Sequence, residues 1–368
     1  MKKIYLISLT LLFALITTSG FSQTDKFWSA NSEIRSSITT DKAVARPSFP
    51  AVFKLFNLNI EPLRRELFTI TDNQAKHSTL ITLPNADGGL EQFEVFEASN
   101  FEPSLQARYP GIRAFSGRGI TDKYATVKLS ISPQGIQTMV FRTEKANEFI
   151  EAYSQDHRVY AVFTSQREKG KMAWTCSTED QQVYADLSAK IPGSNLTGSS
   201  TGELKTMRLA QSCNGEYSNY FGAFNIGQIG LVYAAYNATL TRCNGCYEKD
   251  LALHLNLISN TFEDQIIFFD PATDPYTTLG NWNNQLQALL TAVVGDANYD
   301  IGHMFGASGG GGNAGCIGCV CVAGIKGRGI TSPADNIPMG DNFDIDYVVH
   351  EVGHQLGANH TFSHGLEG

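Results

Sequence analysis

Three histidines and one glutamate lie close together near the C-terminal end of this sequence, in the run HEVGHQLGANH at 350–360. A helix turns by about 100° per residue, so His350 and His354 would lie about 40° apart on one face. One helical turn separates two imidazole nitrogens by the distance that a tetrahedral zinc ion needs. The spacing therefore predicts a helix that presents two metal ligands on one face.

The residues around these histidines predict how the helix is anchored and where it ends. Its opposite face is apolar and suits a protein core, with Val348, Val349, Val352 and Leu356. Asp344 or Asp346 is expected to cap the N-terminus of the helix. Gly357 can adopt the left-handed conformation that ends a helix, and the turn that follows would bring His360 to the same metal.

The residue types at this site predict hydrolytic chemistry. Three neutral imidazoles leave the fourth position of one catalytic Zn²⁺ open for water. Glu351 lies beside the histidine face, where it could take a proton from the zinc-bound water and pass it to a leaving amine. The alternative is an amphipathic helix with solvated histidines, but the added glycine and third histidine argue against it. The sequence makes no prediction about calcium.

Length and charge narrow the possible classes of protein. The 368 residues suffice for about two domains, and 42% hydrophobic with 17% charged residues is an ordinary globular composition. The formal net charge of −8 lacks the basic excess of a nucleic-acid-binding protein, so nucleic acid is not expected as a partner.

The first 22 residues have the pattern of a secretory signal peptide. Lys2 and Lys3 precede an apolar run from Ile4 to Ile16, and small residues follow at 20–22. The apolar run is short for a membrane span, which argues against an uncleaved anchor. Losing the two lysines would bring the charge of the mature chain to about −10. No later stretch is long and apolar enough to cross a bilayer, so the mature protein is expected to be secreted and extracellular.

The rest of the chain divides at a segment rich in Gly, Ser and Thr. Residues 23–187 are expected to be β-rich: Val127–Ile131 alternates apolar and polar residues like a half-buried strand, and Gly135–Phe141 follows a turn as the return strand. Similar short runs occur at Ser78–Leu83 and Leu90–Phe96. Residues 188–202 have no apolar period and are predicted to be an exposed linker that proteases can cut.

Beyond this linker, from residue 203 to 368, strands and helices are expected to alternate. Strands are expected at Thr206–Gln211, Leu251–Ile258, Gln265–Phe269 and Tyr299–Phe305, and helices at Phe224–Tyr247 and Leu279–Val294. Alternation of this kind predicts an α/β domain with a largely parallel sheet.

The 350–360 run resembles the metzincin metallopeptidases, whose signature H-E-x-x-H-x-x-G-x-x-H it matches at every fixed position. Within that group the chain is most similar to the reprolysin-like (adamalysin-type) peptidases, in the form found in secreted bacterial proteins. Further stretches that resemble the catalytic domain of these peptidases are Arg208–Ala210 with Gly215–Ser218, Asp300–Phe305 with Gly315–Cys321, and Asn359–His364. The resemblance covers about residues 203–368. It implies a zincin-like α+β catalytic domain with a mixed, mostly parallel sheet and an active-site helix, preceded by a β-rich prodomain.

The same resemblance implies a place for the substrate. In this family a peptide lies extended along the edge strand above the metal, and by position Gly315, Ile317 and Cys319 would supply the backbone groups that hold it. The alternative is that the glycine-rich run at 309–315 is merely a flexible loop.

One part of the family pattern is missing. Metzincins carry a methionine-containing turn after the third histidine, but the last methionine here is Met339. The chain stops at Gly368, eight residues past His360. We therefore expect the sequence to be truncated, with the C-terminal subdomain absent and the activity of this polypeptide in question.

The seven cysteines are expected to be mostly oxidised, because exported cysteines usually form disulfides. The sequence contains Cys176, Cys213, Cys243, Cys246, Cys316, Cys319 and Cys321. Disulfides between the Cys243–Cys246 pair and the Cys316–Cys319 pair are favoured over a second, structural zinc site. The resemblance implies that Cys321 pairs with a cysteine beyond Gly368.

Cys176, just before the linker, is a candidate inhibitory switch. Metzincin zymogens often hold a prodomain thiolate on the zinc in the position of the water, which blocks catalysis. The alternative is a buried or mispaired thiol. His303 and His364 are expected to be structural or surface residues, because a lone histidine is rarely a ligand.

These features together predict a secreted preproenzyme, a zinc metalloendopeptidase that hydrolyses internal bonds of protein or peptide substrates. One rival is a catalytically inactive fragment or degenerate relative that acts as a binding or adhesion module, which the intact ligands and glutamate argue against. The other is a metal-dependent hydrolase of non-protein substrates, which the elongated motif argues against.

Overall fold

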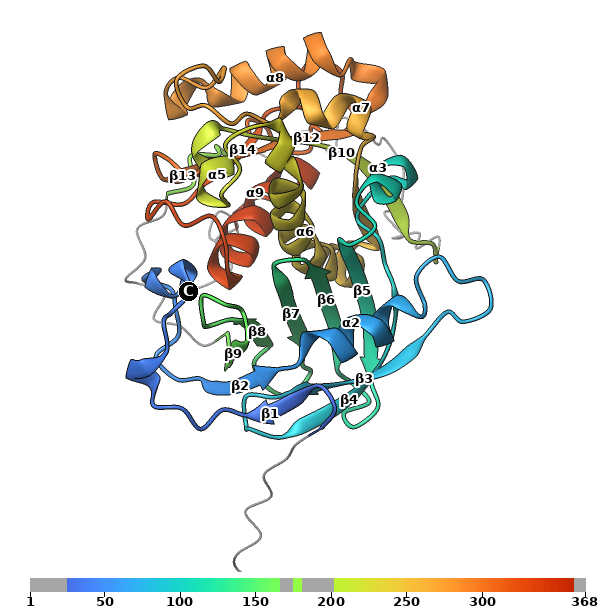
Figure 1. Ribbon diagram of the computed structural model, residues 1–368. Helices are drawn as coiled ribbons and strands as arrows, with labels where there is room; N and C mark the ends of the chain where they lie inside the picture. The colour runs from blue at the N-terminus through green and yellow to red at the C-terminus, as the bar shows by residue number, and fades with distance from the viewer. Residues whose placement is uncertain (1–24, 166–174, 181–201, 361–368) are drawn as a thin grey trace, which may run out of the picture.

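The computed structural model describes residues 25–165, 175–180 and 202–360. The predicted signal peptide, nearly all of the predicted linker and His364 lie outside the described residues. We call residues 25–165 the N-terminal half and residues 202–360 the C-terminal half (Figure 1).

The N-terminal half is built on one nine-stranded antiparallel sheet, in the order β1-β2-β9-β8-β7-β6-β5-β4-β3. Its strands are β1 Trp28–Ala30, β2 Lys54–Leu58, β3 Thr79–Pro84, β4 Leu90–Glu97, β5 Arg113–Gly119, β6 Thr126–Ser132, β7 Gly135–Phe141, β8 Glu148–Ala152 and β9 Val159–Thr164. Its helices are the 3₁₀ turns η1 Arg35–Ser37 and η2 Lys42–Ala45 and the α-helices α2 Ile60–Phe68 and α3 Pro103–Arg108. The chain before the predicted linker is thus β-rich, as its alternating runs indicate.

Strand β6 departs from the half-buried strand that its alternation predicts. Every residue from Val127 to Ser132 is buried, including Lys128 and Ser130 on the polar face. One face packs in the core of the N-terminal half, and helix α6 of the C-terminal half covers the other. The prediction is wrong because the polar side chains meet protein rather than water.

The C-terminal half contains a five-stranded sheet in the order β11-β10-β12-β14-β13. Its strands are β10 Lys205–Cys213, β11 Leu253–Leu257, β12 Ile301–Phe305, β13 Gly311–Asn313 and β14 Gly329–Ser332. All neighbours are parallel except β13, which runs antiparallel to β14 at the edge. The sheet is therefore mixed and mostly parallel, as predicted.

Helices lie on both faces of this second sheet. They are α5 Gly215–Tyr220, η4 Ile226–Gln228, α6 Ile229–Leu251, α7 Asn260–Glu263, η5 Asp264–Ile266, η6 Leu279–Asn281, α8 Trp282–Val293, η7 Asp296–Asn298, the π-helical η8 Asn342–Val349 and α9 His350–Leu356. The strand predicted at Gln265–Phe269 is wrong. Its first residues belong to the 3₁₀ turn η5, so the segment makes only an isolated bridge from Ile267 to Cys213.

Helix α6 lies between the two sheets, as Figure 1 shows. Alternate residues of the C-terminal sheet face opposite layers: Leu209 and Phe305 join the core around α6, whereas Ala210 and Met304 join the core around α8. Because α6 is covered by the N-terminal half on its other side, every residue from Val232 to Gly245 is buried. The two halves thus share α6 as a common central layer.

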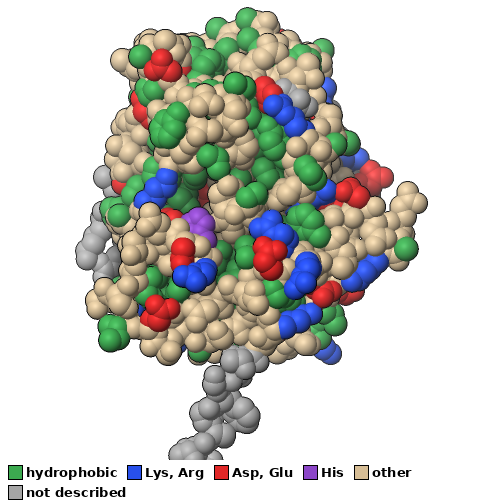
Figure 2. Space-filling view, viewed as in Figure 1, with side chains coloured by type: hydrophobic (Ala, Val, Ile, Leu, Met, Phe, Trp, Pro, Cys, Tyr) green, Lys and Arg blue, Asp and Glu red, His purple; other side chains and the backbone are tan. Residues whose placement is uncertain are grey.

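The helices and the surface of the described residues bear on membrane insertion. Among the helices that the described residues form, none has both the length and the apolar character needed to span a bilayer. Basic and acidic side chains are interspersed on the face in Figure 2.

Candidate metal centre

A continuous helical segment presents the first two candidate ligands. The π-helical η8 runs directly into α9, which begins at His350 and carries His354 one turn later. The back of this segment is apolar: Val348 and Val352 are buried in the core around α6. The helix is therefore amphipathic, as its sequence predicts.

The start of this segment differs from the prediction. Asp344 and Asp346 do not cap it, because the helix begins earlier, at Asn342, and both lie inside η8. Asp344 is buried, with Oδ2 2.9 Å from Nη1 of Arg242 in α6 and Oδ1 accepting a hydrogen bond from Thr239 at 2.7 Å. This aspartate joins the segment to α6 rather than capping its end.

The end of α9 brings the third histidine back to the first two. Gly357 has φ of 118°, in the left-handed region, and its N–H bonds to the carbonyls of Gly353 and His354. A non-glycine residue adopts this conformation only with strain. The chain then reverses, so that the ring centroid of His360 lies 4.4 Å from that of His354 and 5.3 Å from that of His350.

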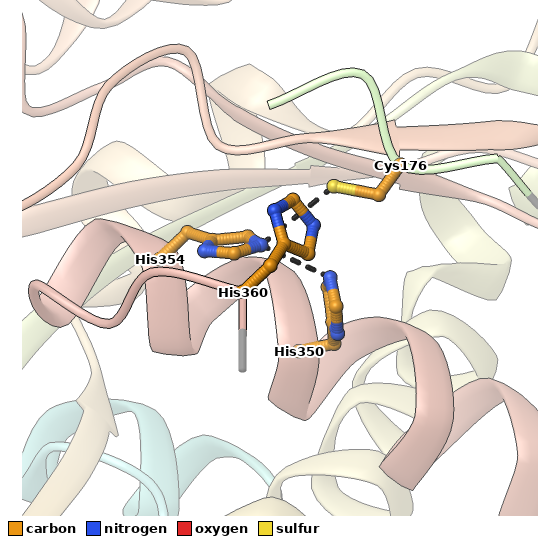
Figure 3. Close-up of side chains that lie close together, drawn as sticks. All are labelled: Cys176, His350, His354 and His360. Atoms are coloured by element: carbon orange, nitrogen blue, oxygen red, sulfur yellow. Dashed lines mark hydrogen bonds between the residues drawn. The ribbon is translucent and has the colours of Figure 1, made fainter. Parts of the chain in front are cut away.

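The four donor side chains of His350, His354, His360 and Cys176 converge on one point (Figure 3). One nitrogen from each ring and the cysteine sulfur all lie within 4.8 Å of one another. Nε2 of His354 lies 3.0 Å from Nε2 of His350 and 3.7 Å from Sγ of Cys176. Three imidazoles and one thiol are a donor set that suits tetrahedral zinc.

The hydrogen bond of His354 to the backbone determines which nitrogen can bind metal. Its Nδ1 lies 2.6 Å from the carbonyl oxygen of Ala358. A carbonyl only accepts, so Nδ1 must carry the proton, which leaves the lone pair of Nε2 directed at the cluster. The turn after Gly357 thus fixes the tautomer of this ring.

Burial sets the protonation of the cluster. Desolvation, reinforced by the neighbouring histidines, lowers the pKa of His350 to about 4, and desolvation also lowers the pKa of His354. Both rings are therefore neutral at pH 7, which is the form that binds metal. Burial and the nearby Glu351 raise the pKa of the Cys176 thiol to about 11, so this sulfur needs a cation beside it to ionise.

Glu351 is buried directly beside the histidines. Its Oε2 accepts a hydrogen bond of 3.0 Å from the hydroxyl of Thr178, and desolvation raises its pKa to about 7. A carboxyl group with a pKa near neutrality can both take up and release a proton.

Gly312 of the edge strand β13 leaves the room that the Glu351 carboxylate occupies. A Cβ atom at position 312 would lie 2.3 Å from Oε1 and 2.6 Å from Cδ of Glu351, which is closer than real Cβ contacts. Sequence reasoning missed this residue. The signal is the glycine-rich run at 309–315, whose sequence alone is equally compatible with a flexible loop.

The segment at 175–180 runs along the free edge of β13. Cys176 pairs with Gly312 in a parallel bridge, Gly312 N donates to Thr175 O at 3.1 Å, and Ser177 N donates to Gly312 O at 3.0 Å. The side chain of Asn313 also donates to the carbonyl of Ser177, at 2.8 Å. The backbone groups of this edge are thus occupied by the chain itself.

Every second residue of this segment contacts a different part of the site. Cys176 meets the histidines, and Thr178 meets Glu351 and accepts a hydrogen bond from Ala314 N at 2.8 Å. Asp180 Oδ1 accepts from His360 N at 2.9 Å and lies 3.0 Å from its Nδ1. A spacing of two places side chains on one side of an extended chain. Sequence reasoning singled out Cys176 but missed Thr178 and Asp180.

The edge strand lies earlier in the sequence than predicted. It is β13, Gly311–Asn313, whereas Gly315, Ile317 and Cys319 belong to the turn that follows. Positive φ angles at Gly315 (70°) and Gly318 (67°) bend this turn, so it cannot continue the strand. The role of these three residues in holding a substrate stays a prediction.

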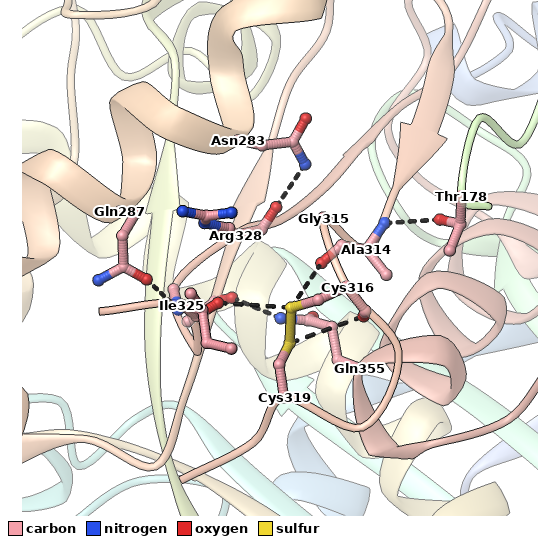
Figure 4. Close-up of a disulfide and its surroundings, with 12 residues drawn as sticks. Thr178, Asn283, Gln287, Ala314, Gly315, Cys316, Cys319, Ile325, Arg328 and Gln355 are labelled. Carbon is pink, nitrogen blue, oxygen red and sulfur yellow. Dashed lines mark hydrogen bonds between the residues drawn. A yellow bond between two sulfur atoms is a disulfide. The ribbon is translucent and has the colours of Figure 1, made fainter. Parts of the chain in front are cut away.

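A disulfide between Cys316 and Cys319 closes that turn (Figure 4). The predicted disulfides between the two cysteine pairs are therefore wrong, and Cys243 and Cys246 are free. On α6, Cys243 faces η8 and donates to the carbonyl of Asp344, while Cys246 packs against the N-terminal sheet, so both are directed away from the turn. Cys321 is exposed and free, and its predicted partner beyond Gly368 remains a prediction.

His303 is a buried residue of β12 that connects the sheet to α9. Its Nδ1 lies 2.8 Å from Oε1 of Gln355, and its Nε2 lies 2.8 Å from Oγ1 of Thr331. Both ring nitrogens are used in these contacts, as in a structural histidine.

The mixed sheet, with α6 and the histidine-bearing α9 packed on one face, fits the zincin-like class of metallopeptidase domains. Residues 203–368 match the family model of the reprolysin-like metallopeptidases, Metallo-peptidase family M12B. The match supports a reprolysin-like metallopeptidase domain in this C-terminal region, and members of that family use zinc. No curated protein matches the chain.

Proposed function

We propose that this chain is the latent form of a secreted zinc-dependent metalloendopeptidase that hydrolyses internal peptide bonds of proteins. The convergence of His350, His354 and His360 beside the buried Glu351 is the observation that supports this most. When bound, zinc supplies a Lewis acid for the scissile carbonyl and lowers the pKa of a water molecule.

Metal binding and proton transfer are assigned to different residues of the chain. The three histidines hold the metal, and the hydrogen bond from His354 to Ala358 keeps that ring in the ligating tautomer. Glu351 acts as the general base toward the attacking water and then returns the proton to the leaving amine. Its burial and its elevated pKa suit both steps.

The substrate is proposed to bind as an added strand on β13. A peptide in extended form would use the same backbone groups of Gly312 that the 175–180 segment uses here. Gly315, Ile317 and Cys319, in the turn after β13, would then contact one end of that peptide.

Cys176 is proposed to keep the enzyme latent. Its sulfur lies within the ligand cluster, where a thiolate would occupy the metal position that the water needs. The 175–180 segment also covers the β13 edge and Glu351, so the latent form is blocked at the metal, at the base and along the proposed binding edge. A cut in the predicted linker at 188–202 is the proposed activating event.

Secretion is proposed from the signal pattern at 1–22. The disulfide between Cys316 and Cys319 is compatible with this, since disulfides persist in oxidising compartments.

The experiment compares zinc content and casein cleavage in the full-length gene product, activated by cutting in the 188–202 segment. The activated protein should contain one zinc ion and cleave casein. Glu351→Ala should keep the zinc and lose cleavage by at least about a hundredfold. The matched control is Glu203→Ala, since Glu203 is exposed and lies outside the site.

Each other outcome argues for a different conclusion. Cleavage retained by Glu351→Ala would show the proposed mechanism to be wrong. Absence of bound transition metal would reject the class of enzyme. Bound zinc without cleavage of any protein or peptide library would favour the binding or adhesion module.

A further inference from the structure

The contact between the two halves has the character of a permanent interface. We propose that the N-terminal half stays bound to the C-terminal half as a non-covalent subunit after the chain is cut in the 188–202 segment. On this view only the 175–180 segment leaves the site, and the mature protein consists of two chains. The proposal is independent of the peptidase activity proposed above.

A buried network of charges crosses the contact. Glu151 of β8 bonds to Arg46 in its own half, at 2.5 Å, and to Arg242 of α6, at 2.8 Å. Arg242 in turn pairs with Asp344, and Arg46 lies 3.5 Å from Asp341. All five side chains are nearly inaccessible to solvent. Separation of the halves would break this network and leave charges without their partners, which is costly for buried ion pairs.

Hydrogen bonds between uncharged groups also connect the halves. The side-chain amide of Asn100 donates to Oδ1 of Asn237 at 3.0 Å and to Oγ1 of Thr241 at 2.8 Å, and its carbonyl accepts from Asn244 at 2.9 Å. The four side chains are buried. The side-chain amide of Asn100 finds these three partners only when both halves are together.

The backbone of the N-terminal half extends the C-terminal sheet. Phe101 bridges Leu257 at the end of β11, with Leu257 N donating to Asn100 O at 2.8 Å and Glu102 N donating to Leu257 O at 3.1 Å. The side chain of Phe101 lies in the same hydrophobic core as α6. One core therefore contains residues of both halves, as in a single folded unit.

Two glycines on the C-terminal side allow the close approach. A Cβ at Gly245 of α6 would lie 2.7 Å from the ring of Phe141 and 2.9 Å from Cγ of Lys128. A Cβ at Gly340 would lie 2.6 Å from the guanidinium carbon of Arg46. The backbone of the C-terminal half therefore lies directly against the N-terminal half at both positions.

The 175–180 segment is held by a different and smaller set of contacts. It bonds to β13 and to the side chains of the site, and Cys176 is only partly buried. Its release requires none of the interface contacts above to break. A cut after it can therefore open the site while the halves stay together.

The test uses the full-length protein with residues 188–202 replaced by the recognition sequence of a site-specific protease. Glu351→Ala is included so that the protein cannot digest itself. After complete cleavage, shown on a denaturing gel, gel filtration at micromolar concentration should give one species with the mass of the uncut chain, also in high salt, because buried charges are poorly screened. Two separate species, or loss of one half by precipitation, would overturn the proposal.

A variant tests whether the charge network holds the halves. Glu151→Gln removes the acid shared by two buried guanidinium groups, and the dissociation constant of the cut protein should rise at least about tenfold. Glu61→Gln is the matched control, because its side chain is 70% exposed. An equal dissociation constant in both variants would overturn the role of the network. If the Glu151→Gln chain cannot fold, gel filtration of the cut protein with the unaltered interface decides whether the halves stay together.

Discussion

The hydroxyl of Thr178 lies 3.0 Å from Oε2 of Glu351, although 173 positions separate the two residues in the chain. The same oxygen of Thr178 accepts a hydrogen bond from Ala314 N, just after the edge strand. A single threonine thus engages the proposed general base and the backbone beside it. The latency that we propose would therefore depend on a second contact besides the cysteine.

Replacing Thr178 by valine should weaken the inhibition of the uncut protein. Valine fills nearly the same volume but cannot bond to Glu351 or Ala314, so two buried groups lose a partner at a cost of about 1–3 kcal/mol each. We expect the uncut Thr178→Val protein to cleave a fluorogenic peptide at least about tenfold faster than the unaltered uncut protein.

Serine at the same position provides the control. Thr178→Ser keeps the hydroxyl and should stay as latent as the unaltered protein. Once the activating cut has been made, all three proteins should have equal rates, because Thr178 has left the site. Equal latency of the valine and serine variants before the cut would contradict the second contact.

Gly312→Ala should damage the site while sparing the metal. The added methyl group would overlap the Glu351 carboxylate, so either that side chain or the edge strand must move. Because misplacement of a reacting group by about 1 Å can cost about a hundredfold in rate, we expect a loss of that order in the activated enzyme. Zinc content, measured by atomic absorption, should be unchanged because the three atoms nearest to the added methyl group all belong to Glu351 and none to a histidine.

The control for this substitution is Gly280→Ala, a position where a Cβ would have no neighbour within 4 Å. Its activity should equal that of the unaltered enzyme. If Gly312→Ala were fully active, the close approach of Glu351 to the edge strand would have no bearing on the reaction.

The parts of the site that sequence could predict are those governed by local geometry. The spacing of His350 and His354 follows from the period of a helix, and Gly357 marks the end of that helix. The sequence therefore predicts both the helix that presents these histidines and the residue at which it ends. Strand and helix alternation likewise predicts the mostly parallel sheet.

The parts that sequence could not predict depend on contacts between distant segments. Lys128 and Ser130 were expected to face water, because nothing near them in the sequence shows that α6 covers that face. Asp344 was expected to cap a helix, but its partner, Arg242, lies 102 positions away. Alternation and capping patterns indicate that a polar side chain requires water or a hydrogen-bond partner, but they do not indicate which distant segment provides that partner.

Acid should destabilise the fold through His303. Burial lowers the pKa of this ring to about 4, against about 6.5 in an unfolded chain, and the hydrogen bond that the ring donates to Gln355 only partly opposes that effect. Between these values the unfolded chain binds a proton that the folded chain does not, so the free energy of unfolding should fall as pH decreases from about 6.5 toward about 4. By about pH 5 the loss from this one ring is about 2 kcal/mol.

Denaturant unfolding near pH 7 and near pH 5 can isolate this contribution, with His303→Gln compared with the unaltered chain. The variant should be less stable near neutrality, because it disturbs the contacts to Gln355 and Thr331, but it should lose about 2 kcal/mol less on acidification. All other titratable groups are the same in the two proteins, so the difference between the two slopes belongs to residue 303. His77→Gln, which alters an exposed ring, should leave the slope unchanged. Equal slopes for the His303→Gln and unaltered proteins would show that the buried ring takes up its proton as readily in the folded chain as in the unfolded one.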